Sequence, residues 1–247
     1  MPLALQAGLW GLLSGSALLL GAAVGWFTRL SARTIAGIMA FGAGVLISAL
    51  SFELMDEART HGGLAATAIG FLAGAAIYTL ANIIVARLGA RHRKRSGGPH
   101  PGASDANGMA LAVGALLDGI PESVVIGVSL VAGGQVSIVA VAAVFLSNIP
   151  EGLSSAAGMK KAGRSFGFVL GLWGAIALAS GAAAFIGFTA FGSASPATIA
   201  VVQALAAGAI LAMIVDTMVP EAFEGTRDYA GLIAVTGFLA AFALSGR

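Results

Sequence analysis

The stretch LLDGIPESVV, from Leu116 to Val125, places two carboxylates and a proline inside a long apolar run. A second stretch, LSNIPEGLSS from Leu146 to Ser155, repeats the tripeptide Ile-Pro-Glu in the next apolar run. Proline removes a backbone donor from a helix, and a carboxylate is costly to hold in an apolar environment. The two stretches therefore mark a place where hydrophobic helices carry polar chemistry.

The composition is that of a membrane protein with several spans. The chain has 247 residues, of which 58% are hydrophobic and only 10% are charged, and its mean hydropathy is +0.94. Soluble domains carry about 25% charged residues. The 36 glycines suit a bundle in which helices approach closely. Cysteine is absent from the sequence, which excludes disulfides and thiolate metal sites.

Apolar runs of roughly 20 residues predict an all-α bundle with eight transmembrane helices in a single domain covering residues 1–247. The first run has no basic region before it and no cleavage site typical of a signal peptide, so we expect it to be retained as a helix. The expected spans lie near residues 5–27, 35–55, 63–86, 108–131, 136–159, 166–191, 197–219 and 229–245.

Basic residues predict the orientation, because short cytoplasmic loops carry an excess of Lys and Arg. With eight spans, one side of the membrane receives almost all of them: Arg29, Arg33, the cluster between Arg87 and Arg95, Lys160, Lys161, Arg164 and Arg227. The other side receives Arg59 and Arg247. We therefore expect both termini outside and a cytoplasmic linker at residues 87–107. His92 and His100 in that linker are either part of a positive-inside signal or weak metal collectors.

Two segments of the chain predict an internal repeat. Aligned without gaps, FGAGVLISALSFELMDEA (Phe41–Ala58) and LAAGAILAMIVDTMVPEA (Leu205–Ala222) both combine small residues with a terminal acidic cluster. The first segment runs outward and the second runs inward. Repeats of opposite topology are common in secondary transporters, whose substrate sites lie near the middle of the membrane at interrupted helices.

The spacing of the polar residues predicts that they converge. Asp118 and Glu122 are four residues apart and share one helix face, as do Ser147 and Glu151, and Asn148 lies three residues before Glu151. Each proline also releases a carbonyl one turn earlier, at Leu117 for Pro121 and at Leu146 for Pro150. No Lys or Arg lies within these two runs, so we expect no internal salt bridge and propose a bound cation. The alternative is two proline kinks whose acids stay protonated and hydrogen-bonded.

These features together resemble the ZIP (Zrt/Irt-like) family of divalent metal transporters, in its prokaryotic form. The resemblance rests on eight spans with outside termini, a basic loop after the third span, the paired Pro-Glu motifs, and the segments Phe41–Ala58 and Leu205–Ala222. It implies a 3+2+3 inverted-repeat bundle and a mid-membrane metal site on the fourth and fifth spans. It also implies a homodimer, and movement of spans one, four, five and six as one unit against the others.

The resemblance implies a metal site of Asp118, Glu122, Ser147, Asn148 and Glu151. Asp118 stands where the family usually has His, Gly119 stands where it usually has Asn, and residues 166–191 carry no acid. Carboxylate and carbonyl oxygens suit harder ions than imidazole does. We therefore expect transport of Zn²⁺, with Fe²⁺ and Mn²⁺ also accepted. A second layer of acids forms either interfacial polarity or an entrance and exit for cations: Glu53, Asp56, Glu57, Asp216, Glu221 and Glu224.

Two other classes of function compete with transport. An intramembrane metallohydrolase would need histidine ligands, and no His lies within any expected span. A metal sensor or structural protein of the same fold would keep the site without moving the ion. We expect no enzymatic activity and no nucleic-acid partner, and we expect location in a bacterial inner membrane.

Overall fold

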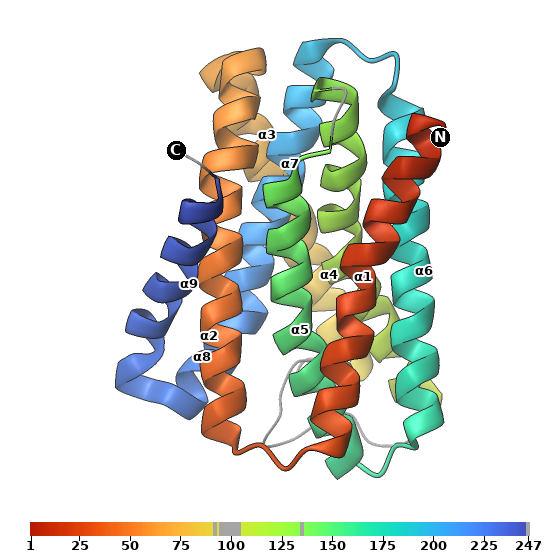
Figure 1. Ribbon diagram of the computed structural model, residues 1–247, viewed down its shortest axis with the longest axis vertical. Coiled ribbons are helices and arrows are strands. Elements are labelled where there is room, and N and C mark those ends of the chain that lie inside the picture. The colour runs from red at the N-terminus through yellow and green to blue at the C-terminus, as the bar shows by residue number, and fades with distance from the viewer. Residues whose placement is uncertain (91–92, 94–104, 134–135, 246–247) are drawn as a thin grey trace.

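The computed structural model describes residues 1–90, 93, 105–133 and 136–245 (Figure 1). These residues form helices and turns and no strand, which confirms the all-α prediction. The helices in chain order are α1 (Leu3–Phe27), α2 (Ala32–Ala49), η1 (Leu50–Leu54), α3 (Met55–Val85), η2 (Ala86–Ala90), α4 (Asp105–Gly133), α5 (Ile138–Lys161), α6 (Phe166–Phe191), α7 (Pro196–Met213), η3 (Ile214–Met218), α8 (Val219–Thr226), η4 (Arg227–Tyr229) and α9 (Ala230–Leu244).

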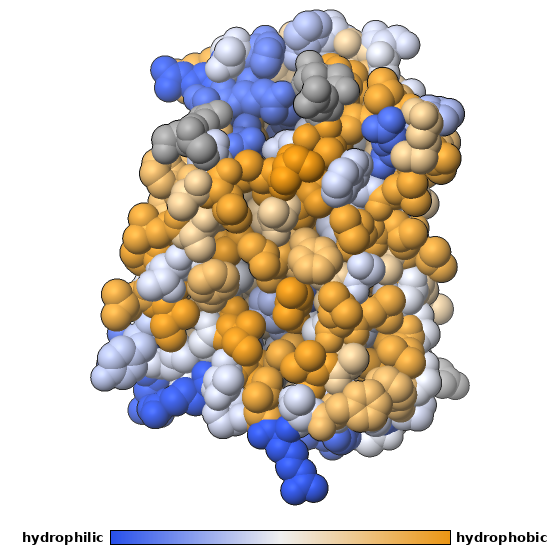
Figure 2. All heavy atoms as spheres, viewed as in Figure 1, coloured by the Kyte–Doolittle hydropathy of each residue, from blue (hydrophilic) through white to orange (hydrophobic). Residues whose placement is uncertain are grey.

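Six helical runs within the described residues are long and apolar enough to cross a membrane. Four of them are about one span long, and the other two, Ala32–Gly89 and Pro196–Leu244, contain 58 and 49 residues. Figure 2 shows hydrophobic residues over the middle of the visible face and hydrophilic residues gathered toward its two ends. The chain is therefore an integral membrane protein by length and composition of its helices.

The two long runs are not straight. Within α3, Gly63 has φ 72° and ψ 169°, a conformation that is not helical and that glycine adopts readily. Between α8 and α9, Arg227 has φ 44° and ψ −110°. In Figure 1, α2 rises to the end at which α3 begins, and α3 then descends behind it. Each long run thus folds back on itself instead of extending as one rod.

The helices pack as two groups. In the first, here called the α2 group, α2 pairs with α9 and α3 pairs with α7. In the second, the α1 group, α1 pairs with α5 and with α6, and α4 also pairs with α6. The two groups meet mainly where α2 contacts α5 and where α4 contacts α7. The interface between the two groups is here called the seam, and a polar contact along it joins one group to the other.

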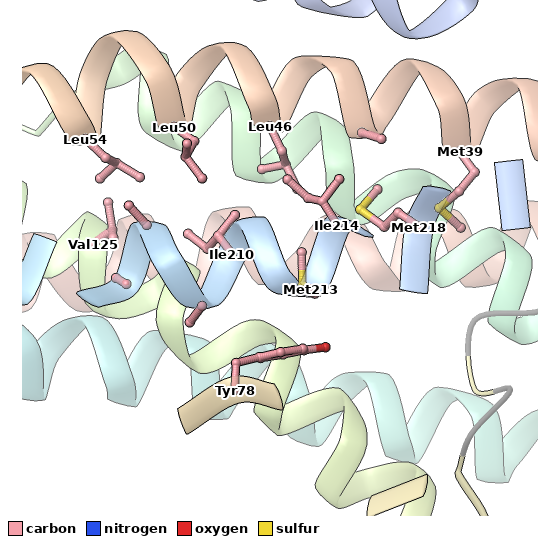
Figure 3. Packing of buried hydrophobic residues seen from close by; sticks show 14 of the residues in the cluster. Met39, Leu46, Leu50, Leu54, Tyr78, Val125, Ile210, Met213, Ile214 and Met218 are labelled. Atoms are coloured by element: carbon pink, nitrogen blue, oxygen red, sulfur yellow. The ribbon is translucent and has the colours of Figure 1, made fainter. Parts of the chain in front are cut away.

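The core of the α2 group is apolar and continuous. Figure 3 shows Leu46 and Leu50 facing Ile210 and Ile214 across the space between α2 and α7. The ring of Tyr78, from α3, lies at the edge of the same cluster and is 1% exposed. A second cluster holds the α1 group together, with members from all four of its helices that include Leu18, Leu111, Met159 and Trp173.

The two segments aligned in the sequence have the same irregularity at the same place. The π-helical turn η1 begins at Leu50, the tenth residue of Phe41–Ala58, and η3 begins at Ile214, the tenth residue of Leu205–Ala222. π-Helical turns are rare and occur mostly as single turns within α-helices, often at functional sites. A shared π turn at one aligned position is a structural correspondence between the two segments.

Matching glycines let the paired helices of the α2 group touch. A Cβ at Gly44 would collide with the Ala234 carbonyl of α9, and a Cβ at Gly208 would collide with the Phe71 carbonyl of α3. Gly44 and Gly208 occupy the same position of the aligned segments. The same two helix pairs make two further contacts of this kind, between Gly237 and the Phe41 carbonyl and between Gly74 and the Leu205 carbonyl. Close backbone approach of this type stabilises membrane helices by dispersion.

Substituting these glycines should separate the helices. We expect Gly44→Ala and Gly208→Ala each to destabilise the protein by about 1–3 kcal/mol, because the added methyl group meets backbone that cannot move alone. The measurement is unfolding in mixed detergent micelles. Gly171→Ala on α6 is the matched control, since nothing lies within 4 Å of its added Cβ. Equal stability of all three variants would contradict the assigned role.

Candidate functional site

The two Pro-Glu motifs lie within continuous helices. Pro121 is inside α4 and Pro150 is inside α5, and both helices run through their prolines. Pro150 also faces the α2 group, because a Cβ at Gly42 of α2 would lie 2.8 Å from its ring. The prolines therefore place the predicted site residues at the seam between the two groups without ending either helix.

Asp118 forms a buried salt bridge with Arg93. The guanidinium binds both carboxylate oxygens, with Nε 2.9 Å from Oδ2 and Nη2 2.8 Å from Oδ1. Asp118 is 2% exposed and Arg93 is 4% exposed. The expectation that these acids form no internal salt bridge is therefore wrong for Asp118. The two runs themselves contain no Lys or Arg, but Arg93, which follows α3 in the chain, lies beside Asp118.

Two side chains of α3 complete this cluster. The Tyr78 hydroxyl donates to Asp118 Oδ1 at 2.7 Å, and Arg93 Nη2 lies 3.0 Å from the same hydroxyl. Arg93 Nη1 donates to Asn82 Oδ1 at 3.0 Å, and Asn82 Nδ2 lies 3.4 Å from Asp216 Oδ2 in η3. Tyr78 and Asn82 come from the α2 group, whereas Asp118 comes from the α1 group. The polar network thus crosses the seam.

Glu122 and Glu151 are both buried but line different cavities. Glu151, 5% exposed, shares a small cavity with Arg93, Ser155 and Trp173, and its charge attracts the guanidinium. Glu122, 2% exposed, lines a separate, mostly apolar cavity together with Leu50 of η1. Among the described residues, no three His, Cys, Asp or Glu side chains come together as a metal site. The structure brings Arg93 to Asp118, and it places Glu151 in the cavity that Arg93 also lines.

Ser147 and Asn148 use their donors within the protein. The Ser147 hydroxyl donates to the Val144 carbonyl of its own helix at 3.0 Å. The Asn148 amide donates to the Ser14 carbonyl of α1 at 2.9 Å. A hydroxyl and an amide that donate in this way still offer an acceptor oxygen. Both side chains therefore retain the atom with which they would contact a cation.

The outer layer of acids divides into anchored and exposed members. Glu53 accepts from the Ser137 hydroxyl at 3.2 Å, and the buried Glu221 accepts from the Ser154 hydroxyl at 3.1 Å. Both bonds join the α2 group to α5. Glu57 is half-buried, whereas three of these acids are exposed: Asp56, Asp216 and Glu224. His92 and His100 lie outside the described residues.

Arg93, Tyr78 and Asn82 belong to the site but were not predicted from the sequence. Tyr78 and Asn82 lie four residues apart in an apolar run, so they share one helix face, and this pair was a visible signal of a polar partner. Arg93 gave no such signal, because it is one of several basic residues in the linker. Neither a family model nor a curated protein matches this sequence.

The salt bridge should show strong coupling in a double-mutant cycle. Removing one partner of a buried ion pair costs about 3–5 kcal/mol, because the other charge is left uncompensated. We expect Asp118→Asn and Arg93→Met each to destabilise the protein by this amount, and the double variant to cost well below their sum. Unfolding in mixed micelles measures all three, with the exposed Asp228→Asn as control. Additive losses would argue against the pair.

Proposed function

We propose that this chain transports divalent metal cations through a carboxylate site on α4 and α5. The observation that carries the proposal is the buried Asp118 held by Arg93, beside a second buried acid, Glu151. A charge in a low-dielectric interior needs a counter-charge. Here that counter-charge comes from a residue outside the spans, which can be exchanged for a free cation without unfolding a helix.

The resemblance to ZIP transporters supports this reading. If each long run contains two spans, divided near Gly63 and near Arg227, the chain has the eight spans of that family. The corresponding π turns and glycine contacts favour an inverted repeat in a 3+2+3 order. The same reading puts both termini outside and the linker in the cytoplasm of a bacterial cell, with the chain in its inner membrane.

The donor atoms favour a site that accepts several divalent metals rather than zinc alone. Asp118, Glu122, Ser147, Asn148 and Glu151 offer oxygen only, and oxygen ligands suit Mn²⁺ and Fe²⁺ as well as Zn²⁺. A divalent ion moved by this chain is its substrate, so the site needs to bind it and release it. Flexible carboxylates from two helices serve that purpose better than a rigid cage.

The position of Arg93 links metal binding at Asp118 to the loss of the salt bridge. A metal that binds Asp118 competes with the guanidinium, because two cations that share one carboxylate repel each other. Tyr78 and Asn82 belong to the α2 group, so a sliding of the α1 group would also break their bonds to Asp118 and Arg93. We propose that the arginine neutralises the site between transport events and that the ion replaces it.

A non-transporting metal sensor is the second candidate. It is kept open by two departures from the ZIP pattern, Asp118 in place of the usual His and the lack of an acid in residues 166–191. In such a protein the arginine would be displaced by an ion that then stays bound. Flux through the protein distinguishes the two functions, because only a transporter accumulates metal inside a vesicle.

The decisive experiment is uptake of Zn²⁺, Fe²⁺ and Mn²⁺ into liposomes that contain the full chain and an encapsulated metal indicator. We expect uptake of at least one ion, and its loss in Glu151→Gln, which removes a buried charge with little change in shape. Asp228→Asn removes an exposed charge and should leave uptake unchanged. If no ion enters but metal binds in equilibrium dialysis, the protein is a sensor; if neither occurs, the proposal is wrong.

Removing the arginine should raise the affinity for metal. We expect Arg93→Gln to lower the apparent KM for Mn²⁺ roughly tenfold, equivalent to about 1.4 kcal/mol, because the ion no longer competes with a tethered cation. Added Mn²⁺ should also stabilise this variant against heat more than it stabilises the unaltered protein. Arg33→Gln removes an exposed positive charge of α2 and serves as control. An unchanged KM would mean that the guanidinium and the metal do not share Asp118.

A further inference from the structure

A basic cavity lies at one end of the seam between the two helix groups. It measures about 430 Å³, a size typical of ligand sites, and is formed by the ends of α1 and α5 together with the loop that leads into α2. Its polar lining is Thr28, Arg29, Lys160 and Lys161, and none of the acidic residues that the structure describes lines it. In Figure 1 these segments meet at the lower end of the molecule.

The cavity has the features of the membrane–water boundary. Beside it, Trp26 packs against Phe166 with ring centroids 5.3 Å apart, and Phe27 packs against the same ring at 4.9 Å. Tryptophan is enriched at the level of lipid headgroups. From the place of Trp26 we expect Arg29, Lys160 and Lys161 to stand at the depth of lipid phosphates.

One of the cations is held in position by the protein. Lys160 Nζ donates to the Trp26 carbonyl at 2.5 Å and lies 5.3 Å from the centre of the Trp26 ring. An ammonium group has three donors, so this contact leaves donors for a further acceptor. Lys160 is thus oriented at the cavity before any ligand arrives.

The remaining wall is apolar. Leu30 and Ile35 line the cavity together with Ala157, and Ile35 is buried whereas Leu30 is exposed. A free phosphate ion would gain nothing from this part of the wall. A phospholipid fits both parts, because its phosphate meets the cations and its glycerol and acyl carbons meet the aliphatic side chains.

We propose that this cavity is a binding site for an anionic phospholipid, with the headgroup phosphate between Arg29, Lys160 and Lys161. Basic pockets between membrane helices commonly bind anionic headgroups in this way. The proposal is independent of which ion the chain transports. Because Ile35 belongs to the α2 group and Lys160 to the α1 group, the lipid contacts both sides of the seam.

Native mass spectrometry of the full chain in detergent tests the site. Titrated with phosphatidylglycerol and with phosphatidylcholine, the protein should retain the anionic lipid more strongly. Arg29→Gln combined with Lys161→Gln should weaken phosphatidylglycerol binding at least tenfold, since each basic group near a lipid phosphate contributes substantially to binding. Arg29→Lys, which keeps the charge, should bind nearly as the unaltered protein does.

The control variant removes equal charge elsewhere. Arg33→Gln combined with Arg87→Gln lies outside the cavity lining and should leave binding within about twofold of the original. Equal weakening in both double variants would reduce the effect to general charge attraction and overturn the proposal. Stabilisation against heat by inorganic phosphate equal to that by phosphatidylglycerol would also overturn it, because the ligand would then be a free anion.

Discussion

The Asp118 carboxylate sits in the interior of a helical membrane protein, and the arrangement around it follows from the need to compensate its charge. Arg93 supplies the opposite charge through both of its carboxylate-facing nitrogens, and Tyr78 and Asn82 satisfy further donors and acceptors of the pair. A buried ion pair repays its desolvation only with such geometry and such additional hydrogen bonds. The cluster therefore ties α3, α4 and the linker together at one point.

The same cluster lies where the two helix groups meet, and apolar residues such as Val125 also cross from one group to the other there. Within each bundle the helices are held by apolar clusters and by glycine contacts that bring backbones together, such as Gly44 with Ala234 in the α2 group and Gly152 with Leu18 in the α1 group. Between the bundles, polar links recur: Glu53 with Ser137, Glu221 with Ser154, and Asp118 with Tyr78. A hydrogen bond between the two groups can be replaced by another hydrogen bond, whereas the close backbone contacts at the glycines have no such replacement.

Much of the fold was accessible from the sequence because membrane helices are recognised by length and apolarity alone. The all-α class followed from runs such as Phe166–Phe191, and the position of Pro121 and Pro150 within helices followed from their apolar context. The alignment of Phe41–Ala58 with Leu205–Ala222 also anticipated a real correspondence, since both segments place a π turn at their tenth residue. The π turns themselves carried no sequence signal, because they depend on a local change of hydrogen bonding rather than on composition.

The sequence by itself determined which acids would be buried within the helix bundle: Asp118, Glu122 and Glu151 lie in apolar helices, and all three are buried. Only the tertiary structure decided how Asp118 is compensated. Helical spacing identifies partners on one helix face, so it could group Asp118 with Glu122, but it says nothing of a side chain that arrives from a linker. In the structure the guanidinium of Arg93 lies against Asp118, so the compensating cation is a side chain of the protein itself.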